Sequence, residues 1–115
     1  MKITIHLDGR KLEIPNVIRC RNKALGLMFS SKEKAQNLLF EFASPGFWSI
    51  HSFFVFYPFL AIWILDNKVV DYKVIKPFSP LVKSQSAFTK LLEIPLNERN
   101  KDLVASLLSD KPTLR

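Results

Sequence analysis

The chain has 115 residues, a formal net charge of +7, a hydrophobic fraction of 48% and one cysteine. This length fits one domain with one core, so we expect residues 1–115 to form a single domain. The lone Cys20 excludes an internal disulfide and a thiolate metal cluster, and it agrees with a reducing, cytoplasmic location. Residues 1–46 hold eight Lys or Arg against four acids, and residues 66–115 hold nine against six. The basic residues are therefore not concentrated in one segment, and the chain shows no specific signature of nucleic-acid binding.

The amino-terminal residues predict a β-hairpin followed by a third strand. Apolar and polar side chains alternate over residues 2–7, and Asp8 and Gly9 supply the positive φ angles that a tight turn requires. Residues 10–14 form the returning strand and residues 17–21 the third. This start lacks the apolar segment of a secretory signal, which also favours a cytoplasmic protein.

The next part of the chain predicts a helical turn and two more strands. The helical turn covers residues 22–28 and begins at an asparagine cap. Residues 38–42 form a strand that ends at a Pro-Gly turn, and we expect residues 48–53 to be its partner strand.

From Phe42 to Leu65 no side chain carries a formal charge, and this stretch has two interpretations. A membrane-spanning helix needs about 20 apolar residues, which the stretch nearly supplies. However, Pro58 would remove a helical hydrogen bond, and aromatic and β-branched residues dominate, which is typical of strands buried on both faces. We therefore predict no membrane span and two strand pieces, the second covering residues 61–65.

The last part of the chain predicts two further strands and a helix. Residues 69–75 form one strand, and residues 88–94 form another, in which Glu93 lies on the polar face. Apolar residues four apart predict a helix over residues 98–109. The complete pattern predicts a mainly β fold of the β-rich α+β class, with a barrel-like or strongly coiled antiparallel sheet.

Several short motifs follow one another in a recognisable order. They are Ala-Leu-Gly-Leu-Met (24–28), Leu-Leu-Phe-Glu-Phe (38–42), Ser-Ile-His-Ser-Phe-Phe-Val-Phe-Tyr-Pro (49–58), Ile-Leu-Asp (64–66), Val-Val (69–70) and Leu-Glu-Ile-Pro (92–95). This order resembles the DUF192 family of small bacterial and archaeal proteins. The resemblance implies a compact, mainly β domain with no established biochemical activity. Members commonly carry Asp in the place of Leu60, so a family site that used this carboxylate would have lost it in this chain.

Few reactive residues stand at the spacing of a known motif. The three glycines are too far apart for a phosphate-binding loop, and His6 and His51 have no carboxylate or thiol at ligand spacing. We therefore expect no metal site and no cofactor. A small enzyme that uses Cys20 or His51 in a groove is the alternative function, but no pair of catalytic groups is arranged by the sequence, so no catalytic residue is assigned.

A noncatalytic binding module is the favoured function. The polar residues of the uncharged stretch, His51, Ser52 and Ser49, are predicted to anchor a small ligand or a peptide. His51 has the alternative of a rim or core histidine bonded to a backbone carbonyl. The apolar walls of the predicted groove are Phe53, Phe54, Phe56 and Trp63. An exposed edge strand would also allow homodimers to form by strand pairing.

Overall fold

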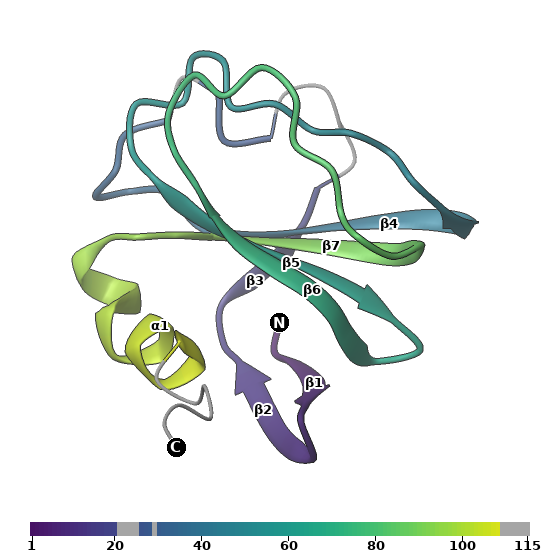
Figure 1. Cartoon of the computed structure of the whole chain (residues 1–115). Coiled ribbons are helices and arrows are strands. Elements are labelled where there is room, and N and C mark those ends of the chain that lie inside the picture. Colours follow the sequence, from purple (N-terminus) through teal and green to yellow (C-terminus); the bar gives the residue numbers. More distant parts are fainter. Residues whose placement is uncertain (21–25, 29, 109–115) are drawn as a thin grey trace, which may run out of the picture.

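A computed structural model describes residues 1–20, 26–28 and 30–108, in which strands predominate (Figure 1). The strands are β1 (Ile3–Leu7), β2 (Arg10–Ile14), β3 (Val17–Arg19), β4 (Asn37–Gly46), β5 (Phe59–Leu65), β6 (Lys68–Ile75) and β7 (Phe88–Pro95). They form one seven-stranded sheet in the order β2-β1-β6-β5-β7-β4-β3, curled into a half-barrel. A short 3-10 helix, η1 (Glu98–Asn100), leads into α1 (Lys101–Leu108). The predicted mainly β fold and carboxy-terminal helix are confirmed.

The central strand, β5, is apolar on both faces. It pairs antiparallel with β6 and β7, and every residue from Phe59 to Ile64 is buried. Because successive side chains of a strand point to opposite faces, Trp63 enters one core and Ile62 the other. The strand predicted for residues 61–65 is therefore confirmed, and the reason for its continuous apolar sequence is that both faces of the sheet are covered.

Different elements cover the two faces of the sheet (Figure 1). The loops that follow β4 and β6 arch over one face, here called the loop face, whose core includes Phe40, Trp63 and Leu91. The other face, here called the helix face, packs against α1 and the β1–β2 hairpin through residues such as Leu60 and Leu107. Asn97 caps η1 by accepting a hydrogen bond from the backbone N–H of Asn100 at 3.1 Å.

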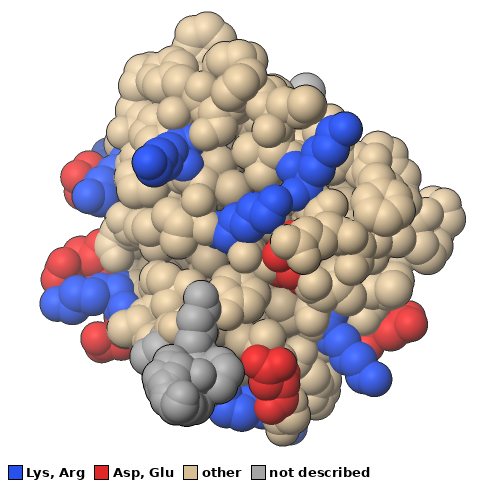
Figure 2. Space-filling view, in the orientation of Figure 1, with Lys and Arg blue, Asp and Glu red and all other residues tan. Residues whose placement is uncertain are grey.

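The turn chemistry of the amino-terminal hairpin agrees with the sequence prediction. Asp8 and Gly9 have φ angles of 50° and 81°, and β1 and β2 pair antiparallel on either side of them. On the face drawn in Figure 2, lysine and arginine side chains are scattered and do not gather in one patch.

The sheet is mixed and not wholly antiparallel, which corrects the predicted pairing. β3 runs parallel to β4, and β1 runs parallel to β6. Residues 20–36 separate β3 from β4, and a connection of this length permits the crossover that parallel strands require. Alternation of apolar and polar residues cannot reveal such pairings, because it is the same in both kinds of ladder.

The partner strand predicted at residues 48–53 is wrong. Within the described chain this segment is a loop with one isolated bridge, between Ile50 and Val82, and β4 pairs instead with β7 and β3. Trp48 folds back to stack on Phe42, with ring centroids 4.4 Å apart. Ile50 is only partly buried, and Trp48 and Phe53 are 39% and 41% exposed, so hydrophobicity alone did not identify a strand.

Two further predictions concern helices. Of the helical turn predicted over residues 22–28, residues 22–25 lie outside the described residues, and residues 26–28 form a turn. Across the described residues, no helix has both the length and the apolar character needed to cross a bilayer.

Candidate functional site

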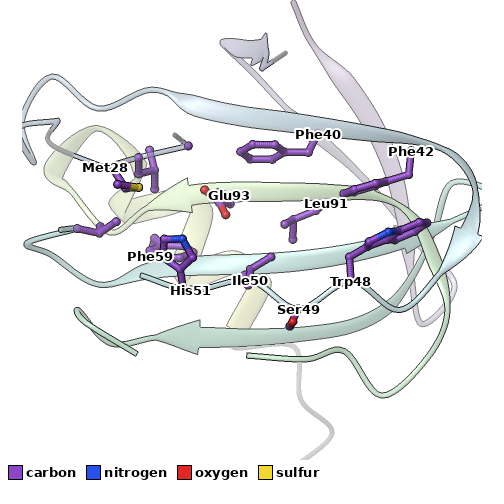
Figure 3. A pocket seen from close by; sticks show the side chains of 13 residues that line it. Met28, Phe40, Phe42, Trp48, Ser49, Ile50, His51, Phe59, Leu91 and Glu93 are labelled. Carbon is purple, nitrogen blue, oxygen red and sulfur yellow. The ribbon is translucent and has the colours of Figure 1, made fainter. Parts of the chain in front are cut away.

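The loop face of the sheet contains a pocket of about 280 Å³ (Figure 3). Its floor comes from β4, β5 and β7, and its walls come from the turn at residues 26–28 and the loop that follows β4. Its main apolar side chains are Met28, Phe40, Phe42, Trp48, Phe59 and Leu91. Its polar side chains are Ser49, His51 and Glu93. The site is therefore concave and mostly apolar, with a few polar groups, as ligand pockets usually are.

Glu93 lies on the floor of the pocket because of its register in β7. Leu91 and Glu93 are two residues apart, so strand alternation places both on the loop face. The side chain is only 6% exposed, and Figure 3 shows it among the lining residues. The sequence prediction that Glu93 belongs to a solvated polar face is wrong, because the turn at residues 26–28 and the loop after β4 cover this side of the sheet.

The carboxyl group of Glu93 has no hydrogen-bond or ion-pair partner among the described residues. Burial raises its pKa from 4.5 to about 8, because the charged form is poorly solvated in an apolar site. At neutral pH the group is therefore mostly protonated. It can then donate one hydrogen bond, or it can ionise if a cation is brought beside it.

A second titratable group, Tyr57, lies close to Glu93 in the loop-face core. Burial is the main reason that the pKa of Tyr57 is raised, and the charge of Glu93 raises this pKa further, whereas the hydrogen bond between Tyr57 Oη and Ser30 Oγ lowers it. Tyr57 is therefore neutral at physiological pH and contributes no compensating charge to the pocket.

His51 lies at the rim of the pocket, as Figure 3 shows. Its Nδ1 accepts a hydrogen bond from the backbone N–H of Phe53 at 3.2 Å, and the two rings lie 5.3 Å apart. The predicted alternative of a bond to a backbone carbonyl is therefore not what the structure has. Because Nδ1 is the acceptor, the neutral ring carries its proton on Nε2, which can donate to a ligand.

Ser49 also lines the pocket, but Ser52 does not. Ser52 is fully buried, and its Oγ donates to the carbonyl of Lys76 and accepts from the N–H of Ser79, both at 2.6 Å. It therefore joins the loop after β4 to the loop after β6. The structure gives this predicted anchor a partner within the protein instead of a place at the pocket.

The predicted aromatic walls are not brought together at the pocket. Trp63 is completely buried in the loop-face core, beneath Lys73, whose Nζ lies 5.7 Å from the ring centroid. Phe54 is 46% exposed and packs edge to face against Phe78, away from the lining residues. The remaining predicted wall residues, Phe53 and Phe56, are likewise exposed outside the pocket.

Cys20 does not line the pocket with His51. It is partly buried after β3, where its backbone N–H donates to the carbonyl of Leu39 at 2.8 Å. Within the described ranges, no three His, Cys, Asp or Glu side chains are grouped in a way that could hold a metal ion. The pocket therefore supplies hydrogen bonds and one ionisable carboxyl group, but not the proposed cysteine nucleophile.

Comparisons with known proteins identify the fold but not the function. No family model matches the chain, and no curated protein matches it. One similar solved structure is a protein of unknown function from Novosphingobium aromaticivorans, with a TM-score of 0.66 and 15% identity over 90% of this chain and 76% of the other. Another is a "putative transcription regulator" from Sinorhizobium meliloti, with a TM-score of 0.68 and 18% identity over 90% of this chain and 84% of the other.

Proposed function

We propose that this chain is a noncatalytic module that binds a small, largely apolar molecule in the pocket of the loop face. The observation that carries this proposal is a cavity built on the sheet, with aromatic side chains around one buried carboxyl group. The cavity, about 280 Å³, lies just below the usual range for ligand pockets, roughly 300–1,000 Å³. Its size favours a compact molecule with one or two rings over a peptide.

The resemblance to the DUF192 family is also part of the proposal. Two of the motifs that carry it, at residues 24–28 and 49–58, supply walls of the pocket through Met28 and His51, among others. We propose membership in this family on the basis of the motifs. We propose a cytoplasmic location on the basis of the single cysteine. Homodimers, if they form, would pair through β2 or β3, the two edges of the sheet.

The alternative function, a small enzyme, receives less support from the site. Nucleophilic catalysis needs a nucleophile and a base within hydrogen-bond reach of the same substrate. Cys20 is not among the lining residues, and Nδ1 of His51 already accepts a backbone hydrogen bond. A binding function needs only the shape and polarity that the described lining provides.

The experiment that tests the proposal is a binding titration with one-ring compounds, including 2-phenylethanol, followed by NMR chemical shifts. We expect saturable shifts for residues of the pocket. Ile50→Trp, which places a large ring on the wall, should abolish them, whereas Ile18→Trp, on an exposed residue of β3, should leave them unchanged. The proposal fails if no compound of this size binds, or if Ile50→Trp binds as well as the wild type.

A further inference from the structure

The environment of Glu93 selects among the molecules that the pocket could hold. The described lining contains no Lys or Arg, so none of the described lining residues supplies a cation to this carboxyl group. A Cβ atom on Gly26 would lie 3.5 Å from Glu93 Oε1, so the turn at residues 26–28 lies directly beside the carboxyl group. An unpaired buried carboxyl group is costly, and a ligand can supply the missing partner.

The aromatic side chains favour the same kind of partner. Phe40, Phe42, Trp48 and Phe59 all line the pocket with Glu93. Aromatic ring faces attract cations, by about 0.5–2 kcal/mol depending on desolvation. An anion in this pocket would meet a carboxyl group among apolar rings, whereas an ammonium group is attracted by the carboxylate and by any ring face over which it lies.

From this geometry we propose that the ligand is an amine, protonated in solution, on a compact apolar body, and that its ammonium group pairs with the Glu93 carboxylate inside the pocket. The inference rests on the proposed function, because it requires that the pocket bind a small molecule at all. The apolar body would pack against the aromatic walls. His51 lies at the rim, and its Nε2 carries the proton of the neutral ring and is therefore a hydrogen-bond donor. An ammonium group needs an acceptor, so Nε2 is not the group that recognises it.

The pairing predicts a particular pH dependence of affinity. Glu93 has a pKa of about 8 without a partner, so an ammonium ligand that binds the carboxylate displaces a proton below that pH. The apparent affinity should rise up to about tenfold per pH unit until about pH 8 and then level off, because an alkylammonium stays charged to about pH 10. The other titratable groups near Glu93 among the described residues are Tyr57, neutral throughout this range, and His51 at the rim.

The test compares 2-phenylethylamine with 2-phenylethanol, which has the same body with a hydroxyl group in place of the amine. Titrations of the full-length protein by calorimetry or NMR are made at about pH 6, 7 and 8.5, so that they span the Glu93 pKa. We expect the amine affinity to rise with pH by at least tenfold overall. The alcohol, which binds best to protonated Glu93, should bind equally well or more weakly as the pH rises.

The variant Glu93→Gln completes the test, since Gln keeps the shape but cannot ionise. At about pH 8.5 we expect the variant to bind the amine at least tenfold more weakly than the wild type does, and its amine affinity should not depend on pH. Its affinity for the alcohol should differ little from that of the wild type. If the variant does not fold, the rise of amine affinity with pH in the wild type, together with the absence of such a rise for the alcohol, still decides the question.

Two results would overturn the inference and leave the proposed function intact: alcohol binding as tight as amine binding at about pH 8.5, or amine affinity that does not rise with pH. If neither compound binds the wild type, the proposed function fails, and the inference fails with it.

Discussion

At the residue scale, the chemistry of this protein is concentrated in one carboxyl group. Glu93 is 6% exposed, has no partner among the described residues, and faces a pocket whose other polar side chains, Ser49 and His51, lie nearer solvent. Buried ionisable groups are normally paired, so an unpaired carboxyl group in a cavity is a reason to assign function there.

The first prediction concerns the pH dependence of stability. The pKa of Glu93 is raised in the folded state, so its contribution to stability is complete below its unfolded pKa, near 4.5, and is lost as the pH rises through about 8. The unfolding free energy of the Glu93→Gln variant minus that of the wild type should therefore increase as the pH rises from about 4.5 to about 8. Urea unfolding of both proteins at about pH 5 and about pH 8.5 measures this difference. A difference that does not change with pH would show that Glu93 is not buried as described.

The second prediction concerns His51. It is exposed at the rim, and its one described hydrogen bond is an acceptor bond of 3.2 Å. His51→Ala should therefore change the unfolding free energy by less than about 0.5 kcal/mol, while it reduces the increase in melting temperature produced by a bound ligand. A large fall in the melting temperature of the ligand-free variant would instead identify His51 as structural.

At the scale of elements, the pocket depends on how two long loops are held above the sheet. Ser52 joins them through its side chain, and its backbone adds bonds to the N–H of Phe78 and the carbonyl of Ser79, both at 2.9 Å. Phe54 and Phe78 have φ angles of 61° and 60°, a left-handed conformation that is unfavourable for aromatic residues. The bonds of Ser52 help to maintain this conformation.

The third prediction follows from this junction. Ser52→Ala removes both side-chain hydrogen bonds and leaves the Lys76 carbonyl and the Ser79 N–H without this partner. We expect a loss of about 1–3 kcal/mol of stability, because the Ser52 hydroxyl group is fully buried. Ser49→Ala is the matched control, since Ser49 is exposed and should cost little. Equal chemical denaturation midpoints for the two variants would contradict the role assigned to Ser52.

At the scale of the whole molecule, the two covered faces of the sheet have different structural roles. The loop face contains the pocket, whereas the helix face packs against α1 and the hairpin. Leu60, the position at which the proposed resemblance to DUF192 implies an Asp in other members, is fully buried on the helix face. Its carboxylate counterpart would therefore not reach the pocket that we describe, and the pocket does not depend on it.

The fourth prediction tests this separation. Leu60→Asp places a carboxyl group in the helix-face core, whose apolar side chains cannot solvate its charge. We expect the substitution to destabilise the fold by more than about 4 kcal/mol or to unfold it. Val74→Asp is the control, because Val74 is the neighbour of Leu60 across the β5–β6 ladder but is 45% exposed. Circular dichroism during thermal unfolding compares the stabilities of the two variants. A stable, folded Leu60→Asp protein would show that this core admits a charge.

The local features of the chain could be predicted because each depends on a few neighbouring residues. Asp8 and Gly9 formed the expected turn, residues 61–65 the expected strand, and the carboxy-terminal repeat of apolar residues the expected helix. His51 and Ser49, which are close in sequence, both line the pocket. Whether they bind a ligand is still a prediction.

The sequence by itself determined most of the strands, the turn at Asp8 and Gly9, and the apolar character of the stretch from Phe42 to Leu65. Only the tertiary structure decided that residues 48–53 form a loop, that two strand pairs are parallel, and that Glu93 lies inside a pocket. The physical reason is that alternation along a strand reveals two faces but not what covers each of them. A glutamate has the same sequence pattern beside water as beneath a loop, and its chemistry differs completely between the two.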